Sequence, residues 1–171
     1  MKKIIPWILF CLILISGIKQ PKAVETSEGS PLWLTNAEVA LADANEKNKP
    51  LLLYFSGSDW CGWCKRLDAE VFSKDEFKAY ADENLALLLA DFPQYTEQDE
   101  ALAAQNQQLR MQFNVETFPT LLLFNSKGML IGKLGYQPGG PAAFIQTIDR
   151  AVARSQMAAP RAPSGPRQPR R

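Results

Sequence analysis

One stretch decides the fold: residues 51–65, which read LLLYFSGSDWCGWCK. Its apolar beginning ends in a Ser-Gly-Ser turn, so it predicts a buried strand. Apolar residues in the following segment, 66–72, recur at helical spacing and predict a helix. Cys61 and Cys64 therefore lie where a strand is followed by a helix.

This position favours chemistry at the first cysteine. A residue at the start of a helix faces unpaired backbone N–H groups and the positive end of the helix dipole. Both stabilise a thiolate, which is the nucleophile in disulfide exchange, and Cys-x-x-Cys motifs lower the thiol pKa from about 8.5 to roughly 3.5–7.5. We therefore interpret Cys61 and Cys64 as a redox-active pair.

A structural disulfide or a metal site explains the pair less well. A structural disulfide stabilises most when it closes a long loop, and this one closes almost none. A zinc site needs about four ligands. The sequence has no histidine, and the one cysteine besides Cys61 and Cys64 is Cys11, in the apolar N-terminal run. We expect no metal and no cofactor beyond the disulfide. The lack of histidine also excludes Ser-His and Cys-His nucleophilic catalysis.

The charge is balanced overall but uneven along the chain. The 171 residues include 19 basic and 18 acidic ones, a formal net charge of +1. Eight basic residues lie in 1–22 or 156–171, which leaves 11 against 18 acidic residues, a net charge of −7, in the central part. Such a balance gives no special attraction to nucleic acid, and we expect no nucleic-acid partner.

The N-terminus reads as an export signal. Two lysines precede an almost wholly apolar run from Ile4 to Ile15, which contains Cys11. This pattern is typical of a signal peptide, and the run is shorter than the about 20 residues of a spanning helix. Residues 1–22 are predicted to be a signal peptide or an uncleaved N-terminal anchor, and residues 23–31 a linker. The protein is expected to be exported to the periplasm or cell envelope.

Residues 32–155 predict one α/β domain. Continuous apolar strands such as 85–90 suit a sheet covered by helices on both sides, so we predict a central mixed sheet of about four strands with helices on both faces. Residues 156–171, rich in Ala, Pro and Arg, are predicted to be a disordered tail. Strands are expected at 51–55, 85–90, 121–124 and 129–134, and helices at 35–48, 61–72, 73–81, 97–113 and 144–152.

The motifs together resemble the thioredoxin superfamily. The resemblance rests on WCGWCK at 60–65, on VETFPTLLLF at 115–124 and on Lys127-Gly128 followed by Gly135. GSDWCGWC at 57–64, EVF at 70–72 and DFP at 91–93 further resemble exported Dsb-type periplasmic disulfide reductases and the C-terminal thioredoxin-like domain of the transmembrane thiol–disulfide interchange protein.

The resemblance implies a thioredoxin fold and a set of substrate-binding residues. Pro119 is expected to follow a cis peptide bond, with the backbone of Phe118 offered to an extended substrate. Trp60 is expected to pack beside the motif, and Trp63 to face the partner. The substrate-binding residues implied by the family are Trp60, Gly62, Trp63, Thr117, Phe118 and Pro119.

Two departures from the family pattern concern the site. Ordinary thioredoxins carry a buried Asp on the strand before the motif and a Lys on the next strand, and Tyr54 and Leu87 stand in those places. The family's usual acid/base for the second cysteine is therefore missing, and Asp59, Glu70 and water are the candidates for its role. The dipeptide between the cysteines is Gly-Trp, where thioredoxin has Gly-Pro.

The predicted function is a thiol–disulfide oxidoreductase that reduces client disulfides. Cys61 attacks the client disulfide and Cys64 resolves the mixed disulfide. A membrane thiol-reductant carrier is the expected donor, because the chain has no nicotinamide- or flavin-binding segment, and the protein is expected to be a monomer. Two alternatives stay open: a disulfide oxidase or isomerase, and a non-catalytic thioredoxin-like binding or chaperone module.

Overall fold

The computed structural model describes residues 33–158, which form a four-stranded sheet in the order β2-β1-β3-β4. β2 runs parallel to β1, and β3 runs antiparallel to both β1 and β4. The sheet therefore confirms the predicted mixed arrangement. The strands are β1 (Leu51–Ser56), β2 (Ala86–Asp91), β3 (Thr120–Phe124) and β4 (Leu130–Leu134).

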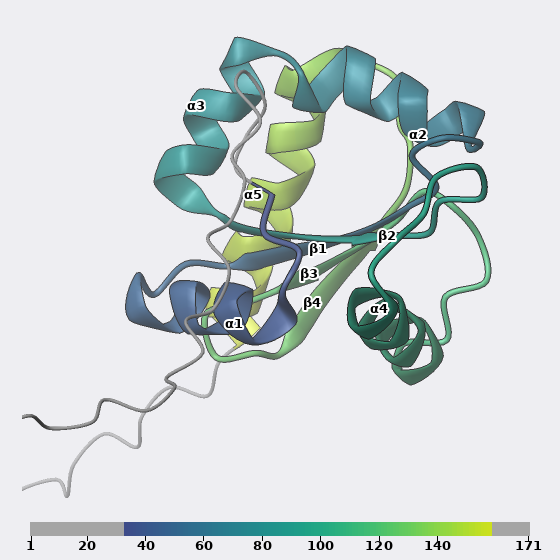
Figure 1. Cartoon of the computed structure of the whole chain (residues 1–171). Coiled ribbons are helices and arrows are strands. Elements are labelled where there is room, and N and C mark those ends of the chain that lie inside the picture. Colours follow the sequence, from purple (N-terminus) through teal and green to yellow (C-terminus); the bar gives the residue numbers. More distant parts are fainter. Residues whose placement is uncertain (1–32, 159–171) are drawn as a thin grey trace, which may run out of the picture.

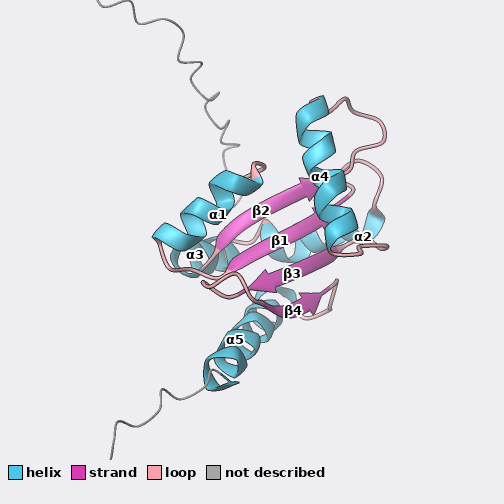
Figure 2. Cartoon of the chain, turned by 90° about the horizontal axis from the view of Figure 1, so that it is seen from below, coloured by secondary structure: helices cyan, strands magenta, loops and turns pink. Residues whose placement is uncertain are grey.

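Helices cover both faces of the sheet, as the sequence predicts (Figures 1 and 2). One face carries α2 (Gly62–Leu67), its continuation η1 (Asp68–Phe72), α3 (Asp75–Asn84) and α5 (Gly140–Ala158). The other face carries α1 (Ala37–Glu46) and α4 (Glu100–Gln112). The result is a three-layer α/β arrangement with β1 in its centre.

Every residue of β1 is buried, and alternate side chains enter two separate hydrophobic cores. Leu52 and Tyr54 face the core beneath α2, α3 and α5. Leu53 and Phe55 face the core beneath α1 and α4. This two-sided burial explains why the strand reads as a continuous apolar run. Because β1 is held on both faces and both edges, its end is a firm support for the cysteine motif.

The helix after the motif is not a continuous α-helix. Six α-helical residues are followed by the π-helical turn η1, which ends at Phe72. The C-cap residue is Ser73, whose hydroxyl donates to the carbonyl of Ala69. The chain then restarts as α3 at Asp75, so the predicted break near Phe72 is confirmed. A π-helical turn inside a helix is frequent at functional sites.

The ends of the domain differ slightly from the predicted ones. α5 continues to Ala158, three residues past the expected boundary, while the predicted leader at 1–22, the linker at 23–31 and most of the predicted tail lie outside the described residues. Leu34 forms an isolated parallel bridge to Leu88 at the free edge of β2. Between residues 33 and 158 we find no helix whose length and hydropathy would allow it to cross a membrane.

Candidate active site

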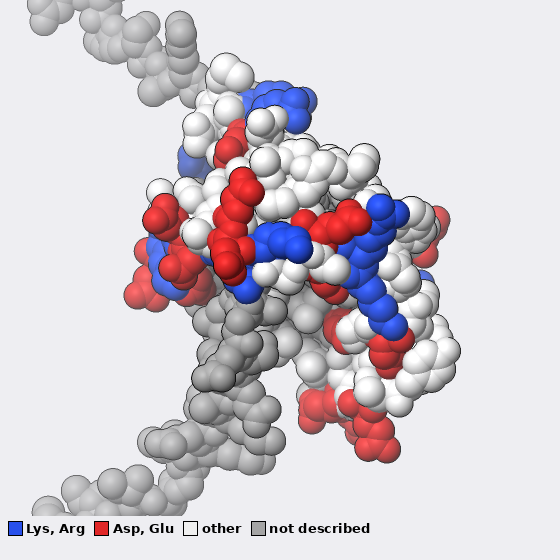
Figure 3. Space-filling view, turned by 90° about the horizontal axis from the view of Figure 1, so that it is seen from above, with Lys and Arg blue, Asp and Glu red and all other residues white. Residues whose placement is uncertain are grey.

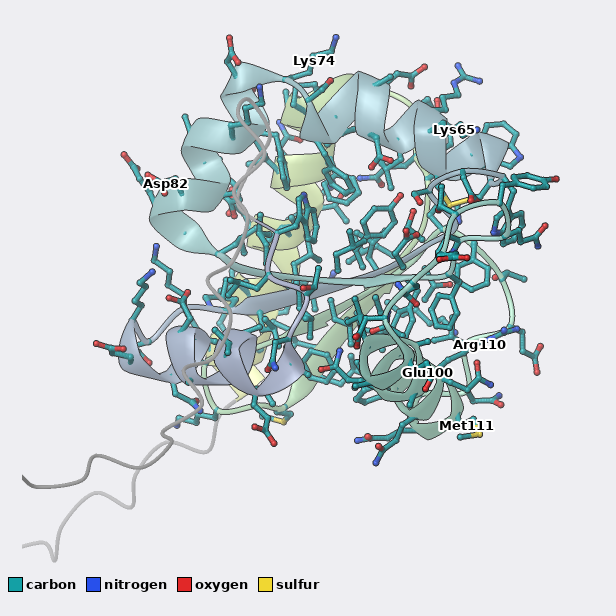
Figure 4. The ribbon with its side chains drawn as sticks, viewed as in Figure 1. Lys65, Lys74, Asp82, Glu100, Arg110 and Met111 are labelled. Carbon is teal, nitrogen blue, oxygen red and sulfur yellow. A yellow bond between two sulfur atoms is a disulfide. The ribbon has the colours of Figure 1, made fainter. Side chains whose placement is uncertain are left out.

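The two cysteines form a disulfide at the first turn of α2, with their Cα atoms 5.2 Å apart. Cys61 is the N-cap residue, and its sulfur accepts a hydrogen bond of 3.1 Å from the backbone N–H of Cys64. Cys64 is fully buried, whereas Cys61 keeps 5% of its surface exposed. Figure 4 shows the disulfide as a yellow bond beside α2, the helix that carries the labelled Lys65.

Close packing fixes the turn before Cys61. The backbone N–H of Cys61 donates to the carbonyl of Gly57 at 2.8 Å. The indole of Trp60 lies directly over Gly57, so that a β-carbon at this position would clash with the ring. The indole N–H of Trp60 donates to the carbonyl of Phe92 at 2.7 Å. Trp60 thus packs beside the motif and ties it to the segment after β2.

The carboxylate of Asp59 binds the backbone of the segment that follows β2. It accepts hydrogen bonds from the N–H groups of Gln94, Tyr95 and Thr96, at 2.7–3.1 Å. Partial burial opposes ionisation, but these N–H groups outweigh it and lower the pKa of Asp59. These contacts give Asp59 a structural role, because its carboxylate fixes the backbone of residues 94–96. Its predicted role as an acid/base stays a prediction.

Glu70 lies in η1, the continuation of the helix that begins after Cys61, and belongs to an exposed cluster of side chains. One of its oxygens accepts from Arg66 and the other from the hydroxyl of Tyr136, both at 2.7 Å. The hydrogen bond from Tyr136, followed by that from Arg66, lowers the pKa of Glu70. Both carboxylate oxygens of Glu70 thus form hydrogen bonds to Arg66 and Tyr136 and none to the cysteines. The predicted role of Glu70 as an acid/base also stays a prediction.

Trp63, the second of the two residues between the cysteines, packs against Tyr136 and Arg66 of this cluster. Its ring centroid is 5.0 Å from that of Tyr136, and the guanidinium of Arg66 lies 5.5 Å from it. The side chain nevertheless keeps 54% of its surface exposed. Beside it Gly62 faces open space, because a β-carbon built there meets no atom within 4 Å.

The loop before β3 forms the opposite side of the site. The Phe118–Pro119 peptide bond is cis, as expected. The Phe118 ring packs edge-on against Trp60, with centroids 5.7 Å apart, and the guanidinium of Arg110 lies over its face. Thr117 accepts a hydrogen bond from Thr120 through its carbonyl, which shapes the loop. Figure 4 shows Arg110 on α4, on the other face of the sheet from α2.

A small cluster of polar side chains lies beneath Cys64. The hydroxyl of Tyr54 donates to the carbonyl of Cys64 at 3.5 Å and accepts from the hydroxyl of Ser56 at 3.1 Å. The carboxyl group of Asp68, one turn after Cys64, lies near the same Tyr54 hydroxyl. The pKa of Asp68 is raised to about 6, mainly by burial and to a smaller extent by the charge of Asp91, while the Tyr54 hydroxyl acts in the opposite direction.

Comparison with known proteins identifies the family. The sequence profile of the thioredoxin-like domain matches residues 37–151. The chain belongs to the thioredoxin-like family. Disulfide bond reductase DsbH of Chlamydia pneumoniae is 36% identical over 120 residues, which cover 70% of this chain and 72% of DsbH. A solved DsbH oxidoreductase is 30% identical with a TM-score of 0.69, covering 78% of this chain and 95% of that one.

Two further thioredoxin-like relatives are more distant. The thioredoxin-related protein DsbJ of Chlamydia pneumoniae is 27% identical over 75% of this chain and 37% of DsbJ. The reduced C-terminal domain of Neisseria meningitidis DsbD shares the fold, with 21% identity and a TM-score of 0.51 over 67% of this chain and 92% of that one. With the disulfide of its Cys-x-x-Cys pair, this thioredoxin-like chain is a member of the thiol–disulfide oxidoreductases.

Most of the expected site residues surround the disulfide of this thioredoxin-like protein. Trp60 and Phe118 contact each other, and Gly62 and Trp63 lie in the first turn of α2. Asp68 is not among the residues that the sequence predicts for the site, although it lies four positions after Cys64, on the buried face of the same helix. A charged residue at an apolar position of a helix is the signal that could have identified it. Within residues 33–158, no group of three His, Cys, Asp or Glu could hold a metal ion.

Proposed function

We propose that this protein reduces disulfides of client proteins in the cell envelope. The observation that carries the proposal is the cap geometry of Cys61, whose sulfur accepts the N–H of Cys64 at the start of α2. Once the pair is reduced, the same N–H and the helix dipole would stabilise a thiolate on Cys61. The name of the relative DsbH, a disulfide bond reductase, supports the reductive direction.

The reaction proceeds by two exchanges. The Cys61 thiolate attacks one sulfur of the client disulfide, the client S–S bond breaks, and the other client sulfur leaves as a thiolate. Cys64 then loses its proton and attacks the Cys61 sulfur, releasing the client's second thiolate and forming the Cys61–Cys64 disulfide. Two electrons pass to the client, and two protons complete its thiols.

Each turnover leaves the protein oxidised, so a dithiol donor must reduce it again. The chain has no segment for a nicotinamide or a flavin, and a membrane thiol-reductant carrier is the donor that fits this requirement. The apolar run from Ile4 to Ile15, which lies outside the described residues, supports export to the envelope. Cleavage or retention of that segment would decide between a free and an anchored form.

The reduction potential of the Cys61–Cys64 couple tests the direction of electron flow. We expect a value near that of thioredoxin, about −270 mV, and a value near −120 mV would indicate a disulfide oxidase. Insulin reduction with a dithiol donor tests turnover. Wild type should precipitate insulin and Cys61→Ser should not. Equal precipitation by both proteins would refute catalysis by this pair.

A further inference from the structure

The disulfide is almost buried, and two exposed indoles flank Cys61 and Cys64 in the sequence; we call these indoles, Trp60 and Trp63, the aromatic rim. Cys61 exposes 5% of its surface, whereas the flanking Trp60 and Trp63 expose 36% and 54%. Because both exposed indoles are neighbours of Cys61 or Cys64 in the sequence, we expect a client sulfur that reaches Cys61 to pass close to them. A cysteine within an extended or loosely folded segment can do so, and the side chains next to that cysteine then lie against the rim.

One side of the rim is held by neighbouring side chains although it is exposed. The indole of Trp63 is flanked by Tyr136 and Arg66, and the Glu70 carboxylate joins these two groups with one oxygen each. Arg66 also lies 5.1 Å from the ring centroid of Tyr136, so that the cluster is closed on itself. Aromatic residues that are fixed before binding make effective anchors, because little side-chain entropy is lost on association.

The cluster presents apolar surface with its charges neutralised. The Arg66 cation forms an ion pair with Glu70, both of them on α2–η1. Figure 3 shows acidic and basic side chains interspersed over the face that carries α2, η1 and α3, without a large patch of one sign. Charge therefore offers no basis for selecting a client at this rim, whereas the exposed indole does.

We propose that Trp63 is a preorganised anchor for a bulky apolar side chain next to the client cysteine, and that Glu70 is the residue that positions it. The proposal rests on the reductase function proposed above and names its substrate class: disulfides in extended segments with an apolar neighbour. Glu70 acts through Tyr136 and Arg66 and has no contact with the sulfur atoms in this arrangement.

Two peptide disulfides that differ only in the residue next to the cysteine, Leu or Ser, test the anchor. We expect reduced wild type to favour the Leu peptide about tenfold in kcat/KM, the effect of one apolar contact in a binding site. Trp63→Ala should bring this ratio close to one. Glu70→Gln and Tyr136→Phe should fall in between by raising KM for the Leu peptide while keeping kcat.

Asp43→Asn is the matched control, because Asp43 forms an exposed i,i+4 ion pair with Lys47 on α1, across the sheet from the site. It should keep the wild-type ratio. A tenfold ratio that persists in Trp63→Ala would overturn the anchor. A lower kcat for both peptides in Glu70→Gln would instead place Glu70 in the cysteine chemistry and overturn its positioning part.

A binding measurement separates this inference from the proposed function. It uses peptides of the same two sequences in which the cysteine is S-methylated, so that no disulfide exchange can occur. Oxidised wild type should bind the Leu peptide more tightly than the Ser peptide, and Trp63→Ala should bind both equally. Reduction of neither peptide would refute the reductase function, and the binding ratio would still decide for or against the anchor.

Discussion

The carboxyl group of Asp68 faces the hydroxyl group of Tyr54 beneath Cys64, and burial raises its pKa to about 6. In ordinary thioredoxins the buried acid comes from the strand before the motif, where this chain has Tyr54. Here the carboxyl group comes from the helix after the motif. The β2 residue beside Tyr54 is Leu89, while Leu87 pairs with Leu52, so that neither position offers a lysine. The charge that reaches Asp68 from β2 is the negative one of Asp91.

Asp68→Asn should stabilise the oxidised protein at neutral pH. An unfolded Asp titrates at about 3.9, below the native pKa of about 6. The native state therefore binds this proton more strongly, and the free energy of unfolding of wild type falls as pH rises from about 4 to about 6. Asparagine does not ionise, so the free energy of unfolding of the variant does not fall in this way as pH rises. Urea unfolding should show a gain of about 1–2 kcal/mol at pH 7, after allowance for partial exposure, and almost none at pH 4.

Asp59→Asn is the control for this experiment because its effect has the opposite sign. The pKa of Asp59 is lowered, so its contribution to stability is present at neutral pH and is lost as pH falls through the native pKa. The variant should therefore unfold more easily at pH 7 than wild type does. A gain for Asp68→Asn that is the same at pH 4 and pH 7 would contradict the role of its ionisation.

Cys61 should be the cysteine that alkylating reagents label first. Cys61 caps the helix and keeps some exposure, whereas Cys64 is buried one turn further inward. Limited treatment of the reduced protein with iodoacetamide at neutral pH, followed by peptide mapping, measures the order. Faster labelling of Cys64 would assign the nucleophile to the other residue.

Cys64→Ser should trap clients as mixed disulfides, and Cys61→Ser should trap none. Without the resolving thiol the intermediate has no intramolecular exit, so it persists until an outside thiol attacks it. Non-reducing gels of tagged variants, compared with the same samples after reduction, detect the trapped species. Equal trapping by both variants would mean that the two cysteines do not divide the work in this way.

The strand and helix around the motif could be predicted because their signals are local. β1 is an unbroken apolar run bounded by a turn, and the cysteine spacing places the pair at a helix start. The predicted break after Phe72 follows from the same kind of signal. A local pattern suffices wherever the neighbouring residues in the sequence decide the structure.

The partners of the acidic residues could not be predicted, because they come from distant parts of the chain. Asp59 meets the backbone of residues 94–96, and Glu70 meets Tyr136 on the loop after β4. Proximity in sequence to the cysteines made both residues acid/base candidates, while the contacts that engage their oxygens depend on the fold. Asp68 has a weak sequence signal, a charge at an apolar helix position, and its burial near Tyr54 becomes evident only in the fold.

The rate at which Cys61 is alkylated should change with pH in two steps. The sequence predicts a single ionisation below about 8.5, and the structure adds Asp68 as a group that titrates near pH 6 one turn from Cys64. Coupling to Asp68 would give the wild-type curve a second step near pH 6. Asp68→Asn should remove that step, whereas Asp59→Asn and Glu70→Gln should keep it, because the pKa values of Asp59 and Glu70 are lowered by their partners. A step that disappears in Asp59→Asn or Glu70→Gln would identify that residue as the acid/base in place of Asp68.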